Sequence, residues 1–162
     1  MQALLLVPLL FTGAIFGFFF AWVCSTMWGL DASDPRIAIT AMQNMNASVR
    51  NAVFFPAFFL TPIVQIGAAV VFWWGSHSAV AIPLALAAAV YLAGAFLPTA
   101  LVNVPMNEAL AAVAVPDSME EAQAIWRDYS GRWQAWNIAR TFGSGLSLLL
   151  VGWAMLSFQP LK

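Results

Sequence analysis

The chain has 162 residues, of which 62% are hydrophobic and only 8% are charged. Ordinary soluble domains carry roughly 25% charged residues, so this composition excludes a soluble globular enzyme and a disordered chain. Six Lys and Arg against seven Asp and Glu give a net charge of −1, which excludes a nucleic-acid binder because nothing neutralises a phosphate backbone. One His and one Cys supply neither a zinc site nor a disulfide framework. The sequence therefore predicts an integral membrane protein.

Long uncharged stretches predict four membrane spans, because a spanning helix needs ~20 mostly apolar residues and pairs its backbone groups internally. We expect one membrane domain over residues 1–162, with spans near 3–27, 51–74, 79–102 and 136–158. The predicted fold class is all-α: an integral membrane four-transmembrane-helix bundle with a short amphipathic helix between spans 1 and 2 and another before span 4. His77, in the turn between the second and third spans, is expected at the surface.

The charge distribution predicts an orientation for this multi-pass protein in the lipid bilayer. Four spans place both termini on one side of the membrane, and the connections 31–50 and 103–135 on the other. Five of the six Lys and Arg lie on the connection side. The positive-inside rule therefore places the connections in the cytoplasm and both termini outside it.

Small residues predict where the helices pack. Gly13 and Gly17 form a GxxxG pattern in the first span, and the third span carries many alanines. Small residues let helix backbones approach closely in lipid. We expect these faces to pack within one bundle, with a homo-oligomer as the alternative.

Three clusters of polar residues are unusual in so apolar a chain. In the first, Gln43, Asn46 and Arg50 share one face if residues 38–55 are helical. The segment Ile37–Val53 has no Gly or Pro, so we expect this helix to continue into the second span. Its polar face either lines a wet cavity or belongs to an amphipathic helix at the membrane interface.

The second cluster, Asn103 and Asn107 with Glu108, surrounds Pro105 at the end of the third span. Proline frees a carbonyl in the preceding turn, and amides supply donors and acceptors without burying a charge. The alternative interpretation is a helix C-cap, where Asn is common.

The third cluster is a helical stripe in and before the fourth span, and it consists of Trp126, Tyr129, Trp133, Asn137 and Arg140, with Trp136 beside it. An arginine that enters a span normally faces the bundle interior with a partner, and Glu108 is the expected partner of Arg140. A purely structural Arg140–Glu108 pair is the alternative. Together the clusters would ring one end of the bundle and suit a flat, partly apolar ligand with oxygen substituents.

Several segments resemble the anthrone oxygenase family of small four-helix membrane proteins, many of which have no known function. The resemblance covers about residues 5–157, and its motifs are GFFFAW, Gln43-x-x-Asn46-x-x-x-Arg50, Asn103-Val104-Pro105-x-Asn107 and Arg132-Trp133-x-x-Trp136-Asn137-x-x-Arg140. Family members in fungal polyketide pathways are linked to the oxidation of anthrones to anthraquinones.

The resemblance implies a membrane-embedded oxygenase that acts with O2 on a lipophilic, anthrone- or quinol-like phenol and needs no metal or organic cofactor. Such an enzyme needs a base, donors for a developing oxyanion, and exclusion of water. The implied catalytic residues are Glu108 as a buried base and Arg140, Asn103 and Asn107 as oxyanion donors. The implied substrate-binding residues are Gln43, Asn46, Arg50, Tyr129, Trp133, Trp136 and Asn137.

Two other functions stay open at this point. One is a non-catalytic membrane module: a small-molecule binder, a transporter element or an assembly partner. The other is a copper protein, since Cys24 with Met27 and Met42 with Met45 offer soft ligands for Cu(I). Methionines in such helices are more typical of a packed core, and no metal site is expected.

Overall fold

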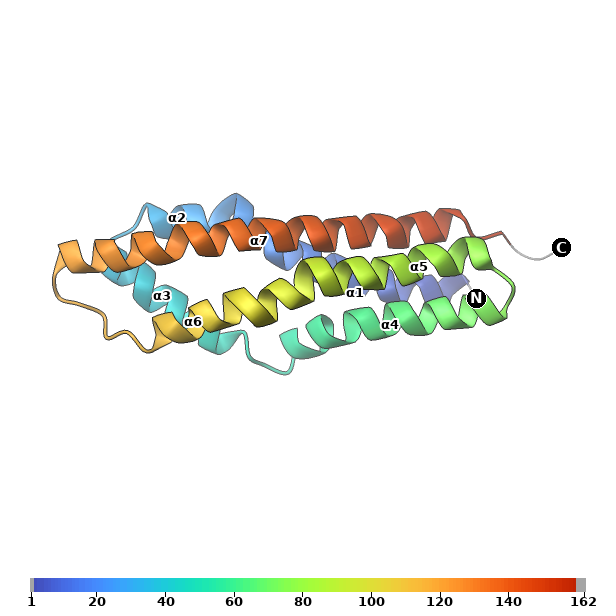
Figure 1. The fold of residues 1–162 in the computed structure, drawn as a ribbon, viewed down its shortest axis with the longest axis horizontal. Helices are drawn as coiled ribbons and strands as arrows, with labels where there is room; N and C mark the ends of the chain where they lie inside the picture. The colour runs from blue at the N-terminus through green and yellow to red at the C-terminus, as the bar shows by residue number, and fades with distance from the viewer. Residues whose placement is uncertain (1, 160–162) are drawn as a thin grey trace.

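This computed structural model describes residues 2–159, and within that range the chain is helical with no strand. Its four longest helical stretches run side by side along one axis (Figure 1), and they are Gln2–Asp31, Phe54–Trp74, Ser78–Ala111 and Met119–Leu156. Each is long and apolar enough to cross a membrane. The predicted all-α bundle of four spanning helices is confirmed.

The stretches are built from α-helices joined by short segments of tighter or wider helix. The elements in chain order are η1 (Gln2–Leu5), α1 (Leu6–Ala21), η2 (Trp22–Thr26), α2 (Met27–Asp31), α3 (Pro35–Ser48), α4 (Phe54–Trp74), α5 (Ser78–Tyr91), η3 (Leu92–Phe96), η4 (Thr99–Asn103), α6 (Val104–Ala111) and α7 (Met119–Leu156). Both ends of the described chain lie at the same end of the bundle as the α4–α5 turn, called here the terminal end (Figure 1). The opposite end, called the connection end, contains α2, α3, α6 and the first half of α7.

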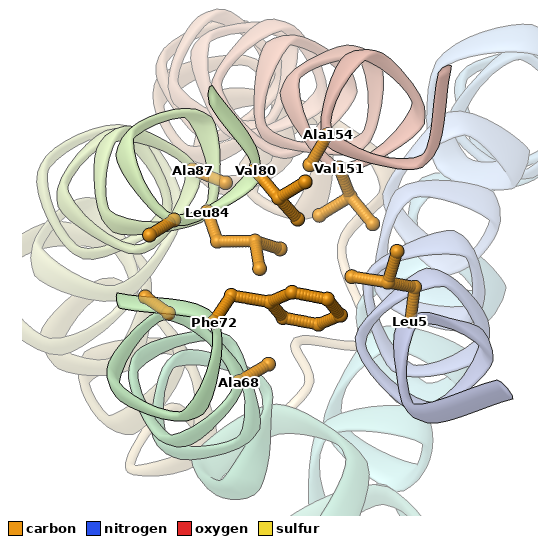
Figure 2. Close-up of a cluster of buried hydrophobic side chains, with 10 residues drawn as sticks. Leu5, Ala68, Phe72, Val80, Leu84, Ala87, Val151 and Ala154 are labelled. Atoms are coloured by element: carbon orange, nitrogen blue, oxygen red, sulfur yellow. The ribbon is translucent and has the colours of Figure 1, made fainter. Parts of the chain in front are cut away.

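The terminal end is filled by apolar side chains. Figure 2 shows Leu5, Phe72, Leu84 and Val151 pointing into the space between the helices, and each is 0% exposed. His77 is also buried, at 8% exposure, with its ring centroid 5.2 Å from that of Phe158. The expectation of a surface histidine is wrong, because the α4–α5 turn folds over this core.

The predicted helix from α3 into the second span is wrong: the chain breaks between Ser48 and Phe54. The backbone N–H groups of Val53 and Phe54 donate to Oδ1 of Asn51 at 2.8 and 2.9 Å, and Nδ2 of Asn51 donates to the Ser48 carbonyl at 2.7 Å. An Asn side chain that satisfies backbone groups in this way competes with helix continuation. The break lets α3 lie across the connection end instead of extending α4.

The third helical stretch is longer than predicted, because it continues through Asn103 to Ala111. The segments η3 and η4 are π-helical, and they end where the N–H groups of Leu97 and Val104 donate to the carbonyls of Leu92 and Thr99. Pro98 and Pro105 lack the N–H groups that regular α-helix would need here, which is consistent with this irregular backbone. Asn103 therefore lies inside a helix, and its interpretation as a C-cap is wrong.

The fourth span and the helix expected before it form one continuous helix, α7, of 38 residues. Ser118 caps its first turn by accepting a hydrogen bond from the Glu121 N–H at 3.4 Å. Because no break separates the polar half from the apolar half, residues from Trp126 to Arg140 keep one helical register. This continuity carries the polar stripe into the membrane-spanning part of the bundle.

Polar contacts fix α2 and α3 at the connection end. The carboxylate of Asp31 accepts hydrogen bonds from three side chains of α7: Trp126 at 2.9 Å, Ser130 at 2.6 Å and Gln134 at 2.8 Å. Asp34 caps α3 and pairs with Arg36 at 2.6 Å, and this contact lowers the pKa of the Asp34 carboxyl. Asp31 therefore holds the end of α2 against α7, and Asp34 stabilises the first turn of α3.

Candidate functional site

The connection end encloses a cavity of about 270 Å³. Its lining comes from α1, η2, α3, α4, η4, α6 and α7 together with the break after α3, and consists of Phe18, Phe19, Trp22, Met45, Asn46, Val49, Arg50, Phe54, Phe55, Phe58, Phe59, Thr99, Asn103, Val104, Asn107, Glu108, Trp133 and Arg140. Its volume is near the lower end of the range for small-molecule sites. The cavity thus lies at the connection end, whereas the terminal end contains the apolar core around Phe72 and Leu84.

Aromatic side chains form most of the cavity wall. The ring centroids of Phe18 and Phe54 lie 4.7 Å apart, and those of Trp22 and Trp133 lie 5.1 Å apart. Phe58 stacks on Phe54, with 5.5 Å between their centroids. The faces and edges of these rings offer favourable contacts to a flat aromatic ligand.

Arg140 is the most unusual residue of the wall, because it is only 5% exposed and lies on a membrane-spanning helix. Its Nη2 donates to Oδ1 of Asn137 at 2.9 Å, and its Nη1 donates to Oγ1 of Thr99 at 3.3 Å. The guanidinium carbon also lies 4.5 Å from the ring centroid of Phe19 and 5.1 Å from that of Trp133. Neutral groups and aromatic faces thus surround this cation.

The expected ion pair between Arg140 and Glu108 is wrong, and so is its purely structural alternative. Glu108 pairs with Arg50 at 3.3 Å, and the two side chains are 60% and 49% exposed. Within residues 2–159 the only ion pairs are this one and Arg36–Asp34. The guanidinium of Arg140 is therefore a buried positive charge that no described carboxylate neutralises.

Glu108 differs from its expected environment as well as its expected partner. Its carboxylate lies at the exposed edge of the cavity, at the side where α6 faces the break between α3 and α4. The expectation of a buried base is wrong, because Pro105 and the π-helical turn before it do not bring Glu108 toward the bundle axis. The residue still lines the cavity, where a carboxylate can accept a proton from a bound molecule.

A chain of hydrogen bonds links the amides on α3 and α6 to the stripe on α7. The Nε1–H of Trp133 and the hydroxyl of Tyr129 both donate to Oδ1 of Asn107 at 2.8 Å. Nδ2 of Asn107 then donates to Oδ1 of Asn46 at 3.0 Å. Nδ2 of Asn46 has no hydrogen-bond partner among the described residues, although this atom is buried.

Asn103 provides a second amide with an unsatisfied atom. The residue is 0% exposed, and its Nδ2 makes a long hydrogen bond of 3.4 Å to the carbonyl of Trp133. Across residues 2–159, the buried side-chain atoms without a partner are Nδ2 of Asn46, Oδ1 of Asn103, Nε of Arg140 and Oε1 of Gln65. Buried polar groups are nearly always hydrogen-bonded, so it is unusual that three of these atoms belong to residues that line one cavity.

The structure brings together seven of the eleven predicted site residues in the cavity wall: Asn46, Arg50, Asn103, Asn107, Glu108, Trp133 and Arg140. Tyr129 and Asn137 lie behind the wall, where they hold Asn107 and Arg140. Gln43 is directed elsewhere, since its Nε2 donates to the carbonyls of Leu110 and Val113, both at 2.9 Å. Trp136 is 39% exposed and does not line the cavity.

Most of the apolar wall and Thr99 were not among the predicted site residues. The signal for the wall was present, because FFPAFF places two pairs of phenylalanines four residues apart, on one helical face. Of the proposed copper ligands, Met27 and Met42 are at most 1% exposed and pack in one hydrophobic core with Met45 beside them, while Cys24 is exposed. Within the described chain no three His, Cys, Asp or Glu side chains cluster as metal ligands would.

A second hollow, of about 480 Å³, lies beside the cavity between α1, the end of α3 and the start of α4. Five side chains line both spaces and so form the wall between them: Phe18, Trp22, Met45, Val49 and Phe54. Apart from Ser48 and Asn51, the lining of this hollow is apolar.

Comparison with known proteins identifies a matching family. The family model described as "Anthrone oxygenase" matches residues 45–150, about two thirds of the chain. No curated protein and no solved structure matches. The matched range contains every polar residue of the cavity wall, from Asn46 to Arg140.

Proposed function

This chain belongs to the anthrone oxygenase family, and on that premise we propose that it oxidises an anthrone- or quinol-like phenol with O2 in the cavity at the connection end. The family and the four spanning helices together describe an oxygenase-like membrane protein. The substrate, the use of this cavity and the absence of a cofactor are the parts that we add as a proposal.

One observation carries the proposal: the buried guanidinium of Arg140 faces an aromatic cavity without a carboxylate partner among residues 2–159. An uncompensated buried charge costs several kcal/mol, so a site that keeps one is prepared for an anion. The aromatic walls favour a flat ring system. A phenolate or enolate within a fused aromatic system satisfies both requirements.

The chemistry can be written without a cofactor because the substrate supplies the electrons. A base removes one proton from the methylene carbon of the anthrone, which leaves an electron-rich enolate. The enolate transfers one electron to O2, and the resulting radical pair combines to form a carbon–oxygen bond to a peroxide. Loss of the second proton from that carbon cleaves the O–O bond, so one O2 gives the new carbonyl and one water.

Each polar group of the wall has a role in this scheme. Glu108, at the edge of the cavity, takes the first proton and returns it to the departing oxygen. Nε of Arg140 and Nδ2 of Asn46 donate to the oxyanion of the enolate, and Oδ1 of Asn103 accepts from a substrate hydroxyl. Asn107 orients Asn46, while Trp133 packs on the rings and helps to exclude water.

The hollow between α1 and α4 provides a route from the bilayer. Its lining is apolar and it shares a wall with the cavity, so a lipophilic substrate reaches the site by displacing Phe18 and Phe54. The connection end would face the cytoplasm, as the distribution of Lys and Arg indicates. Both termini would then lie outside the cytoplasm.

Oxygen uptake tests the proposal. Purified protein in detergent is supplied with 1,8-dihydroxy-9-anthrone, and O2 consumption is followed for the wild type, Arg140→Ala and Arg127→Ala. Loss of an oxyanion donor typically lowers turnover by about 10²–10³-fold, so Arg140→Ala should approach the spontaneous rate while Arg127→Ala, an exposed residue of the same helix, keeps wild-type activity. Spontaneous rates for all three proteins would reject the oxygenase. Tight binding of the probe without turnover would favour the non-catalytic binder.

A further inference from the structure

We propose that Trp133 sets the direction of the hydrogen-bond chain that ends at Asn46, so that the cavity meets its ligand there with an N–H donor and selects an oxygen acceptor. This inference rests on the proposed function only in that the ligand is an aromatic molecule with oxygen substituents. It makes Trp133 a specificity-determining residue through the amides that it orients.

The direction of this hydrogen-bond series is set by the indole of Trp133, the one member that can only donate. An indole nitrogen carries a hydrogen and has no lone pair to accept one, so it only donates. Nε1 of Trp133 lies 2.8 Å from Asn107, and the amide of Asn107 must therefore present its oxygen to the indole. With the oxygen fixed, Nδ2 of Asn107 points away from Trp133.

The same reasoning then fixes Asn46. Nδ2 of Asn107 lies 3.0 Å from Asn46, and a donor there requires the oxygen of Asn46. The remaining atom of that amide, Nδ2, is the buried one that lacks a partner among the described residues, and Asn46 lines the cavity. An amide that would otherwise present either end is thus held with its donor free.

Tyr129 contacts the same oxygen of Asn107, also at 2.8 Å, but it does not impose a direction. A phenol hydroxyl donates or accepts with equal ease. Without the indole N–H, both amides could reverse, with Tyr129 accepting from Asn107 and Asn46 presenting its oxygen to the cavity. Trp133 alone therefore determines the polarity, although both side chains make hydrogen bonds of the same length.

With the amide of Asn46 fixed, the residues of the cavity wall have a defined set of free hydrogen-bond donors and acceptors. Asn46 and Arg140 each keep one buried donor free, and Asn103 keeps one buried acceptor free. Two donors and one acceptor in an aromatic cavity suit a fused-ring ketone or phenolate that also carries a hydroxyl. A ligand that can only donate at the Asn46 position is disfavoured.

The experiment compares Trp133→Phe with Tyr129→Phe. Each substitution removes one hydrogen bond to Oδ1 of Asn107, but only the first allows the amides of Asn107 and Asn46 to reverse. The probes are fluorenone, whose carbonyl only accepts, and carbazole, a tricycle of similar shape whose N–H only donates. Binding is followed by quenching of the tryptophan fluorescence of the protein, to which Trp22 in the cavity wall contributes in every variant. Thermal unfolding of each variant reports whether it folds.

We expect the wild type and Tyr129→Phe to prefer fluorenone, and Trp133→Phe to lose about tenfold of that preference, which corresponds to one hydrogen bond. Asn46→Asp provides a second test that leaves Trp133 in place, because it replaces the free donor with an acceptor and should cause the same loss. Equal ratios in all variants, equal losses for Trp133→Phe and Tyr129→Phe, or no binding by the wild type would each overturn the inference. Oxygen uptake by the wild type tests the proposed reaction separately, so the proposed reaction and the proposed role of Trp133 can fail independently.

Discussion

The backbones of Gly94 and Gly143 are in direct contact where the third and fourth helical stretches cross. A Cβ built on Gly143 would lie 2.6 Å from the Cα of Gly94, and one built on Gly94 would lie 2.8 Å from the Cα of Gly143. Gly143 follows Arg140 by one helical turn, and Gly94 precedes Thr99 on the opposing stretch. The crossing therefore sets the separation of the two helices whose side chains, Arg140 and Thr99, meet in the cavity wall.

Alanine at either glycine should destabilise the bundle. Overpacking typically costs about 1–3 kcal/mol, and here the contact is with backbone, which cannot rotate away. Gly143→Ala and Gly94→Ala should both lower the unfolding temperature in detergent. Gly152→Ala is the control on the same helix, since an added Cβ there meets no described atom within 4 Å. Equal unfolding temperatures for Gly143→Ala and Gly152→Ala would show that the helices separate without cost.

The buried amide of Gln65 predicts an asymmetry between two substitutions. Its Nε2 donates to Oγ1 of Thr12 at 2.8 Å and to Oγ of Ser147 at 2.9 Å, while its Oε1 has no partner among the described residues. Both hydroxyls already donate to backbone carbonyls, so removing the amide leaves no donor unpaired. Gln65→Leu should lie within about 1 kcal/mol of the wild type.

Thr12→Val, in contrast, leaves one N–H of Gln65 buried without an acceptor and should cost about 1–3 kcal/mol. Adding Gln65→Leu to Thr12→Val should restore part of that loss. Denaturation of the two single variants and the double variant measures the difference. A larger loss for Gln65→Leu than for Thr12→Val would contradict this account of the network.

The carboxylate of Asp31 should contribute to holding α2 against α7. It accepts three hydrogen bonds from α7, and because Asp31 itself is exposed we expect each to contribute no more than an ordinary net hydrogen bond, about 0.5–1.5 kcal/mol. We expect Asp31→Ala to lower the unfolding temperature and to increase proteolysis between α2 and α3. Asp128→Ala is the matched control, because Asp128 is an exposed acid on α7. Equal unfolding temperatures for the two variants would show that the hydrogen bonds of Asp31 do not stabilise the protein.

Substitution of Glu108 should separate catalysis from stability. The Arg50–Glu108 pair is exposed on both sides, and such pairs contribute about 0–1 kcal/mol, so Glu108→Gln should unfold at nearly the wild-type temperature. As the proposed base, it should nevertheless lose about 10²-fold or more in turnover of 1,8-dihydroxy-9-anthrone while still binding the anthraquinone product. Glu120→Gln, at the exposed start of α7, is the control. Full turnover by Glu108→Gln would assign the proton transfer to another group.

The sequence alone determined the membrane class, the four spans and the residues that could carry chemistry. Scarce charges within long apolar stretches leave few alternatives, because lipid requires helices of a minimum length. For the same reason Arg140 was noticeable in the sequence, because it lies within a predicted span, where a charged side chain has a high free-energy cost. The helical spacing from Tyr129 to Arg140 was also readable, since it depends only on positions along one helix.

Only the tertiary structure decided which helix faces meet. The GxxxG pattern of Gly13 and Gly17 marks no close crossing, as a Cβ at Gly17 would meet no described atom within 4 Å, whereas Gly94 and Gly143 touch. Arg140 faces Asn137 and Thr99 instead of Glu108. In a soluble protein, polar and apolar faces distinguish outside from inside, but here lipid-facing and buried surfaces are equally apolar. The rotation of each helix about its axis, and with it the cavity, is therefore set by packing that appears only when all four helices are assembled.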